Sequence, residues 1–495
     1  MRLMFSIVTS SCSSVCSCSS HIWSTHQSTV STSIPLSKYP GPRLWAITHF
    51  PDAYHRATGR QAHLVADMHH KYGPVVRTAP NELSFCEEGA WLDIYGKPVS
   101  RSTQLPKDQQ QILPPPSGVW NMSQQPSDEE HQRMRRFFAH GFSEKALRDQ
   151  EPIMNKYFNL FIRRLHENCA KAVDINKWYD LLSFDVMSDL AFGESFGGLE
   201  NSKLHPWTKS MQAMLRAIPV LGITQKYYPL DRILLLIAKP FLRESELKFY
   251  NFVERQVMKR LKLQTPRPDF LVYAQESLNT PESLTFQEIC ENAGLLMVGG
   301  AESTPSALAG VTYLLLCNPT CLAILTSCLR TTFQSVDEIN SVTVNIDYLL
   351  AVLNEALRLY PPVPSIFSRV TPPEGCFIAG RYVPGNTSVS VSQRGINRSA
   401  SNFVRPNEFA PQRWTGDAEF RDDQLKVVQP FSVGPRNCIG RNLAFFEMKL
   451  VLAKLLYSFD LELCEESRGW MDGQKILFFN VRPPLMIKLK PYVKA

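Results

Sequence analysis

The apolar positions of this chain recur mainly at helical spacing, in runs that proline-rich turns separate. The longest run begins at a capping box formed by Thr285 and Glu288 and continues to about Cys317. A further run covers residues 443–459, whereas short stretches between residues 377 and 391 are typical of β-strands. The pattern therefore predicts a mainly helical protein with a minor sheet component.

Prolines shape the first half of the chain. Residues 96–120 contain five prolines, which predict a loop, and a helical pattern begins at Asp128. Residues 183–192 predict another helix. Residues 219–242 form a proline-punctuated apolar stretch, which we interpret as core, with membrane contact as the alternative.

The composition is that of a globular protein with a substantial core, because 44% of its 495 residues are hydrophobic and 20% are charged. The net charge of +7 fits a basic face for an acidic protein partner and is too diffuse to argue for nucleic acid. Residues 1–33 are rich in Ser, Thr and Cys and lack an apolar run long enough to span a bilayer, which predicts a disordered segment. A proline-rich hinge, residues 34–45, leads into a single domain over residues 46–495.

Candidate metal chemistry centres on Cys438, which lies between glycines and just before the run at 443–459. Glycines permit a tight turn, while Arg436 and the following helix N-terminus favour a negative charge on sulfur. All 11 histidines lie at or before His205, so the C-terminal half offers sulfur and no imidazole as a metal ligand. A lone cysteine is usually a small buried hydrophobe, but its neighbours here favour a thiolate ligand.

The segment Phe431 to Gly440 resembles the haem-ligand loop FxxGxRxCxG of the cytochrome P-450 family at every fixed position. The resemblance implies a haem b cofactor with Cys438 as its iron ligand, and Phe431, Arg436 and Gly440 among the residues around it. It also implies the family's fold, a large helical domain with a small β-rich subdomain around a buried haem. Segments such as LNEALRLYPPVP look most like fungal monooxygenases of secondary-metabolite pathways.

Glu355 and Arg358 are three residues apart on one face of an expected helix. An exposed pair of this kind would contribute only about 0–1 kcal/mol, yet the surrounding sequence is apolar and burial is expected. The pair resembles the family's ExxR motif, with Arg413 completing the network and Gln412 where glutamate is common. The resemblance implies a structural role for these three residues, which hold the loop that presents Cys438.

Residues 299–304 interrupt the longest helical run with two glycines, which cost about 1 kcal/mol each relative to alanine. Space for a ligand and close helix packing explain them equally well. The segment resembles the family's oxygen-binding motif, which implies that Glu302 relays protons and that the Ser303 hydroxyl steadies bound oxygen. Gly299 and Ser303 depart from the usual alanine and threonine, and Thr304 offers a substitute hydroxyl that points elsewhere on the helix.

The resemblance also implies cationic partners for the haem propionates, because arginine binds carboxylates in bidentate fashion. Arg436 qualifies through the cysteine loop, Arg135 through the family's WxxxR helix, and Arg369 through its place after the ExxR helix. His131 stands where tryptophan is commoner in that helix, and its ring nitrogen could serve the same propionate.

No nucleotide-binding fingerprint or flavin module is recognisable in the sequence. The resemblance therefore implies electrons from an NADPH–cytochrome P-450 reductase, with a docking face that includes Arg133, Arg136, Arg441 and Lys449. It further implies O2 and an apolar small molecule of terpenoid or polyketide type as substrates, and a place on the cytosolic face of the endoplasmic reticulum membrane. Two alternatives stay open: a reductase-independent haem-thiolate isomerase or dehydratase, which the Glu302–Ser303 pair disfavours, and a non-catalytic haem-binding relic.

Overall fold

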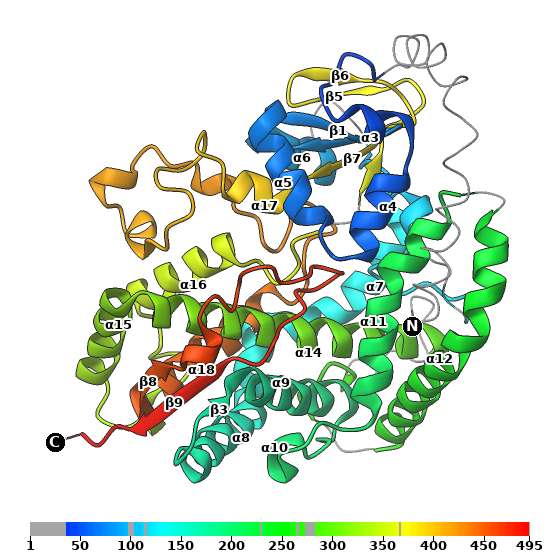
Figure 1. The fold of residues 1–495 in the computed structure, drawn as a ribbon. Helices are drawn as coiled ribbons and strands as arrows, with labels where there is room; N and C mark the ends of the chain where they lie inside the picture. The colour runs from blue at the N-terminus through cyan, green and yellow to red at the C-terminus, as the bar shows by residue number, and fades with distance from the viewer. Residues whose placement is uncertain are drawn as a thin grey trace.

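The computed structural model describes residues 36–97, 103–112, 115, 117–227, 230–263, 267–272, 283–365 and 368–494. Figure 1 shows a large helical part and, at the top, a smaller β-rich part built from the N-terminal segment and the segment after α16. The expected disordered segment, residues 1–33, lies outside the described residues, as does part of the expected loop at 96–120.

The helices follow one another in chain order and make up most of the described chain. They are α3 (Arg43–Ile47), α4 (Phe50–Ala57), α5 (Gln61–Tyr72), α6 (Glu88–Tyr95), α7 (Asp128–Ala139), α8 (Glu144–Asn168), α9 (Ile175–Phe192), α10 (Gly198–Asn201), α11 (Trp207–Thr224), α12 (Leu230–Lys262), α14 (Phe286–Cys317), α15 (Pro319–Thr332), α16 (Asp347–Leu359), α17 (Gln393–Asn397) and α18 (Arg441–Ser458).

The strands are short and form three small sheets. One sheet has the order β1-β2-β7-β4, a second has β3-β9-β8, and a hairpin pairs β5 with β6. The strand β2 runs parallel to β7 and antiparallel to β1, so the N-terminal segment and the segment after α16 share a sheet. The bounds are β1 (Val75–Ala79), β2 (Glu82–Phe85), β3 (Val173–Asp174), β4 (Arg369–Val370), β5 (Cys376–Ile378), β6 (Arg381–Val383), β7 (Ser388–Val391), β8 (Phe459–Leu463) and β9 (Met486–Pro491).

Helix α14 crosses the middle of the helical part (Figure 1) and is buried along most of its length. Its capping box is complete: the Thr285 amide donates to the Glu288 carboxylate at 2.8 Å, and the Glu288 amide donates to the Thr285 hydroxyl oxygen at 3.2 Å. It packs against α9, α12, α16 and α18. A helix that is apolar on most sides needs such surroundings, which makes α14 the central support of the molecule.

The structure confirms the expected mainly helical class, the strands between residues 377 and 391 and the helix that begins at Asp128. The helix expected at 183–192 is longer and forms α9. The core interpretation of residues 219–242 is wrong at Leu236, whose side chain in α12 is 71% exposed. An apolar run alone does not tell which of its faces is covered.

The chain after residue 36 is tied to the β-rich part. Leu36, Tyr39 and Trp45 are buried, and the Tyr39 hydroxyl donates to the Tyr382 carbonyl oxygen at 2.8 Å. In the described part of the chain no single helix combines the length and apolar character of a membrane span, while the bent pair α14–α15 does so jointly.

Candidate haem-thiolate site

The loop that carries Cys438 is closed by its own backbone just before α18. The Cys438 amide donates to the Phe431 carbonyl oxygen at 2.9 Å, which joins the two ends of the loop. Gly434 has a φ of +77°, and a Cβ at this position would overlap the carbonyl oxygen of Tyr95 at the end of α6. Gly434, the first glycine of the motif, is therefore required by the close approach between the loop and α6.

The Cys438 side chain is exposed, yet the surrounding protein raises the pKa of its thiol through desolvation. Both properties fit a sulfur on the wall of an internal hollow. The Gly440 backbone amide and the Arg135 charge oppose the desolvation. We expected Arg436 to supply this charge, and the structure assigns it to Arg135 instead.

Arg436 turns away from the sulfur and clamps the start of α7. Its Nη2 donates to the Asp128 carboxylate at 2.7 Å, and its Nη1 donates to the Gln125 carbonyl oxygen at 2.7 Å. Arg135, on α7, donates in turn to the carbonyl and side-chain oxygens of Asn437 at 2.7 and 2.6 Å. The helix and the cysteine loop are thus bound to each other by two arginines.

Arg369 and His131 present buried side-chain nitrogens that lack partners. Within the described residues, Nε and Nη1 of Arg369 and Nδ1 of His131 find no hydrogen-bond partner. Burial, followed by the charges of Arg436, Lys107, Arg135 and Arg369, lowers the pKa of His131 to about 3. We call Arg135, Arg369, Arg436 and Lys107 the basic cluster. Its three arginines beside a neutral imidazole make a site that favours anions.

Lys107 belongs to this cluster and was missed by the sequence analysis. Burial, helped by the charges of Arg369 and Arg436, lowers its pKa to about 6, and its Nζ donates to the Ser123 carbonyl oxygen. It lies in the proline-rich loop, where no motif marks a single lysine. Lys107 reaches the cluster because the loop folds against β4, where Lys107 and Arg369 form an isolated β-bridge. The sequence alone does not show this contact.

These features fit a haem. Its two propionate carboxylates match the orphaned nitrogens of Arg369 and His131, and its iron matches the Cys438 sulfur. No group of three His, Cys, Asp or Glu side chains in the described part of the chain is placed to hold a bare metal ion.

We expect Arg369→Met to release haem at least about tenfold faster than the unmodified protein, because a hydrogen bond to a charged group contributes about 1.5–3 kcal/mol. Haem transfer to apomyoglobin measures this rate directly. Arg381→Met removes an arginine from the exposed end of β6, where it pairs with Glu87, and serves as the control. Equal rates for both variants would remove Arg369 from the haem site.

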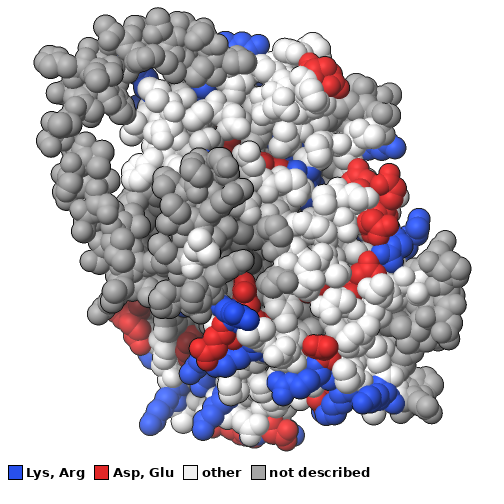
Figure 2. Space-filling model, turned by 90° about the vertical axis from the view of Figure 1, so that its right-hand side faces the viewer, with Lys and Arg blue, Asp and Glu red and all other residues white. Residues whose placement is uncertain are grey.

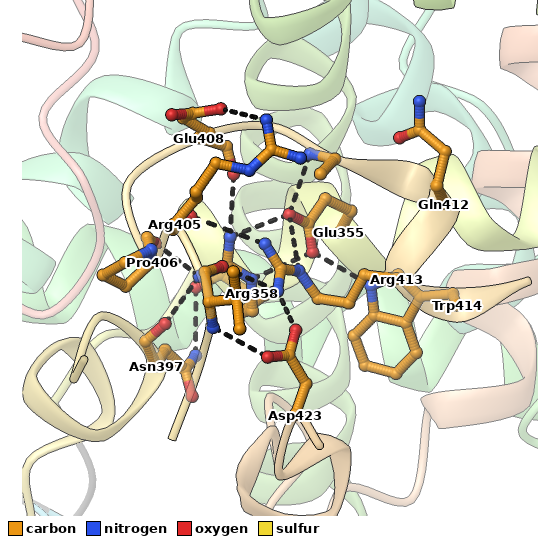
Figure 3. Close-up of polar contacts among 12 residues, drawn as sticks. Glu355, Arg358, Asn397, Arg405, Pro406, Glu408, Gln412, Arg413, Trp414 and Asp423 are labelled. Atoms are coloured by element: carbon orange, nitrogen blue, oxygen red, sulfur yellow. Dashed lines mark hydrogen bonds and ion pairs between the residues drawn. The ribbon is translucent and has the colours of Figure 1, made fainter. Parts of the chain in front are cut away.

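Glu355, Arg358 and Arg413 form a fully buried network at the end of α16 (Figure 3). Glu355 accepts from Arg358 at 2.7 and 2.9 Å and from Arg413 at 3.2 Å. Burial alone would raise the pKa of Glu355, but the hydrogen bonds and charges of the two arginines hold it below its usual value. The expected burial of this network is confirmed.

The network reaches further than the sequence indicated. Arg413 also pairs with Asp423, and the Trp414 ring nitrogen donates to Glu355 at 2.9 Å. Arg358 donates to the carbonyl oxygen of Asn397 at 2.7 Å. Gln412 points away from these residues (Figure 3), so its difference from the family's glutamate leaves the network unchanged.

The two adjacent glycines in the middle of α14, Gly299 and Gly300, have different surroundings. A Cβ on Gly300 would overlap the Met187 side chain of α9, whereas a Cβ on Gly299 would meet nothing within 4 Å. Close packing against α9 therefore requires a glycine at position 300. At position 299 no neighbouring residue requires one, and the space beside it is open. The Ser303 hydroxyl donates to the Gly299 carbonyl oxygen at 2.6 Å, which fixes its position on that same turn.

We expect alanine to have opposite effects at these two glycines. Gly300→Ala should destabilise the protein by about 1–3 kcal/mol, because it overpacks the contact with Met187. Gly299→Ala should stabilise it by up to about 1 kcal/mol, because alanine is the better helix former. Thermal unfolding of the two variants side by side tests the assignment, and effects of the same sign would refute it.

Glu302 and Thr304 face different neighbours. Burial raises the pKa of Glu302 to about 7, against the charge of Arg482. Thr304 is buried and faces Glu447 of α18, whose pKa burial raises to about 8 while the Thr304 hydrogen bond opposes the shift. Thr304 thus points away from the Gly299–Ser303 turn, as the helical spacing predicts.

With this geometry in view, comparison with known proteins is decisive: a family model described as cytochrome P-450 matches residues 39–489. The chain belongs to the cytochrome P-450 family. A similar protein is the averantin hydroxylase of Aspergillus parasiticus, 42% identical over 465 residues that cover 92% of both chains. The cytochrome P-450 monooxygenase lcsI of Purpureocillium lilacinum is 40% identical over 466 residues, covering 92% of this chain and 90% of its own.

The comparisons confirm the family, the fold and the enzyme class that the motifs indicated. This P-450 is a monooxygenase similar to those of fungal secondary-metabolite pathways, and its family implies a haem-thiolate cofactor, O2 and a redox partner. Cys438 is the residue of this chain that matches the thiolate position.

Proposed function

We propose that this P-450 hydroxylates an apolar small molecule of fungal secondary metabolism, of terpenoid or polyketide type, with electrons from NADPH–cytochrome P-450 reductase. The observation that carries the proposal is the Glu302–Ser303 pair on α14, with the Ser303 hydroxyl held 2.6 Å from the Gly299 carbonyl oxygen. Bound haem would supply the oxygen chemistry, inserting one atom of O2 into a C–H bond while the other leaves as water.

The chain's own residues bind, orient and move protons. Cys438 would supply the sulfur for iron, Arg369 and His131 would supply nitrogens for the carboxylates, and Arg135 would add its positive charge beside both Cys438 and His131. Glu302 is a carboxyl poised to exchange protons near neutral pH, and Ser303 is the hydroxyl next to it.

A partly buried apolar side of α14 supports an apolar substrate. Leu295, Val298 and Gly299 lie at helical spacing on one side of this helix and are only partly buried, whereas most of their neighbours are buried. A Cβ on Gly299 would meet nothing within 4 Å, so this side of the helix would offer an apolar molecule contact with two aliphatic side chains beside Ser303.

Oxygen insertion is favoured over isomerisation or dehydration. Two relatives, 41% and 42% identical, are named averantin hydroxylases. An isomerisation or dehydration takes no external electrons and does not need the Glu302–Ser303 proton relay on α14.

The test incubates purified P-450 with NADPH, the reductase and a panel of terpenes and aromatic polyketides under isotopically labelled O2. A product carrying one labelled oxygen, formed only with reductase, supports the proposal. An unlabelled isomer formed without reductase, or no NADPH use with any compound, would favour the alternatives.

We place the reductase on the face that carries Arg136 and Arg441, both of which are exposed. Two other expected docking residues are engaged within the chain, since Arg133 pairs with Glu130 and Glu288 and Lys449 donates to Asn345 at 2.9 Å. Reversing the charge at Arg136 and Arg441 together should raise the KM for reductase several-fold and leave the KM for substrate unchanged. An unchanged KM for reductase would place the docking face elsewhere.

Attachment to the cytosolic face of the endoplasmic reticulum is proposed from an apolar patch near the N-terminus. Leu44, Ile47, Phe50 and Tyr54 of α3 and α4 are all exposed. Figure 2 shows the side of the molecule on which α4, α11 and α12 lie, with most charged side chains in its lower part and along its right-hand edge. A lipid surface is the occupant that an exposed apolar patch of this kind favours.

Flotation with vesicles of phosphatidylcholine and phosphatidylserine tests the lipid proposal. We expect the unmodified protein to float and the Leu44→Ser/Phe50→Ser variant to stay largely in the soluble fraction. Val342→Ser, on a distant exposed apolar residue, is the control. Equal flotation of all three proteins would refute the patch as the attachment surface.

A further inference from the structure

A cleft of about 340 Å³ lies beside Glu302. Its walls come from α9, α11 and the loop before β9, and they include Asp180, Gln212 and Arg482. Lys177, which is exposed, also lines the cleft, so the cleft reaches solvent. Glu302 is therefore accessible to water from a side that no sequence motif marked.

Arg482 links two carboxylates across this cleft. Its Nη2 lies 2.8 Å from Oδ1 of Asp180 and 3.8 Å from Oε2 of Glu302. The first distance is a charge-assisted hydrogen bond, and the second is too long for one. Nη1 of Arg482 is buried and finds no acceptor within the described residues. Arg482 is thus held by Asp180 and keeps Glu302 close without binding it tightly.

We propose that this cleft is the route by which protons reach Glu302 from solvent, and that Arg482 and Asp180 are positioning residues that set the charge of Glu302. The inference rests on the proposed function, because it assumes that Glu302 supplies protons for oxygen insertion. One oxygen insertion consumes two protons, and the reductase supplies the two electrons. In each of the two proton transfers Glu302 gives a proton towards Ser303 and takes one from solvent in the cleft, so the carboxyl is restored each time and Glu302 itself exchanges no electrons.

The arrangement explains why Asp180 is needed. A direct salt bridge between Arg482 and Glu302 would hold Glu302 as a carboxylate, which has no proton to give. Asp180 draws the guanidinium away and adds a second negative charge nearby, which favours the neutral carboxyl. The groups that face Glu302 are Arg482 from the loop, Asp180 from α9, and Arg216 and Gln212 from α11; burial raises its pKa, Asp180 acts in the same direction, and the other three oppose it.

The test follows the Glu302 carboxyl itself by difference infrared titration of the haem-loaded protein, with Glu302→Gln identifying its band. We expect Asp180→Asn to move the titration to lower pH and Arg482→Gln to move it to higher pH. A shift of one pKa unit changes the protonated fraction by up to about tenfold. Product formed per NADPH above pH 7 should fall in Asp180→Asn by a similar factor.

Lys488→Gln is the matched control, because it removes one positive charge from the exposed face of β9, where Lys488 pairs with Glu462. It should change neither the pH at which Glu302 titrates nor the amount of product formed per NADPH consumed. Arg482→Gln leaves two carboxylates without their cation and this variant can fail to fold for that reason. In that case the single variant Asp180→Asn and the double variant Asp180→Asn/Arg482→Gln still test the inference.

The outcomes separate the inference from the proposed function. If the unmodified protein forms an oxygenated product with reductase while Glu302 titrates identically in Asp180→Asn and the double variant, the inference alone fails. If the titration shifts as expected but no oxygenated product forms with any substrate, the positioning of Glu302 stands and the proposed function fails.

Discussion

Glu355→Ala is expected to destabilise the protein by about 3–5 kcal/mol, because it leaves the charges of Arg358 and Arg413 buried without their shared carboxylate. Domains are stable by only about 5–15 kcal/mol in total. The variant should therefore yield little folded protein and retain little haem, although Glu355 touches neither the sulfur nor the substrate face of α14. Urea unfolding of whatever folded protein is recovered, compared with the unmodified protein, measures the loss.

Glu419→Ala provides the control for this prediction. Glu419 pairs with Arg405 at 2.7 Å on the surface, where such a pair contributes about 0–1 kcal/mol. A Glu355→Ala protein that unfolds within 1 kcal/mol of the unmodified one would refute the structural role.

The pH dependence of this effect has a definite sign. The arginines hold the pKa of Glu355 below its usual value, so its stabilising contribution is present above the carboxyl's unfolded pKa. The contribution is lost as pH falls through the folded value. The difference between the unmodified protein and Glu355→Ala should shrink under acid conditions.

Glu302→Gln is expected to lower the rate of product formation by about 10²-fold, within the range that general acid–base groups contribute. Glutamine keeps the size of the side chain but cannot carry a proton between the cleft and Ser303. Haem content should not change, because Glu302 belongs neither to the basic cluster nor to the cysteine loop. Stopped-flow and steady-state turnover with reductase, together with product formed per NADPH, give the measurement.

Glu302→Asp retains the carboxyl and should recover part of the lost rate. Burial raises the pKa of Glu302 to about 7, so the protonated form that donates decreases as pH rises above neutrality. The turnover of the unmodified protein should fall on that alkaline side, and the residual turnover of Glu302→Gln should not follow this limb. Unchanged turnover in Glu302→Gln would show that protons reach Ser303 by another path.

Local patterns predicted much of the fold. The capping box at Thr285 and Glu288 located the start of α14, and the helical spacing of apolar residues located α7 and α18. The ExxR pair was expected to be buried because its neighbours are apolar, and the structure confirms this. These features depend on residues within one or two helical turns, which a sequence displays directly.

Contacts between distant segments could not be predicted in this way. Asp423 joins the ExxR network from a loop, Lys107 reaches the basic cluster from the proline-rich segment, and Arg482 meets Glu302 from the C-terminal loop. No spacing rule connects such positions, because only the folded chain brings them together. The same limit explains why the sequence favoured Arg436 over Arg135 as the charge beside Cys438.

The central property of this P-450 is Cys438 as a thiolate ligand of haem iron. The most direct test is the absorption spectrum of the purified, dithionite-reduced protein under carbon monoxide, recorded beside a Cys438→Ala variant. The expected result is a strongly red-shifted Soret band in the unmodified protein that is lost in the variant. Haem with an unshifted band in the unmodified protein, or well-folded protein that binds no haem, would contradict the account.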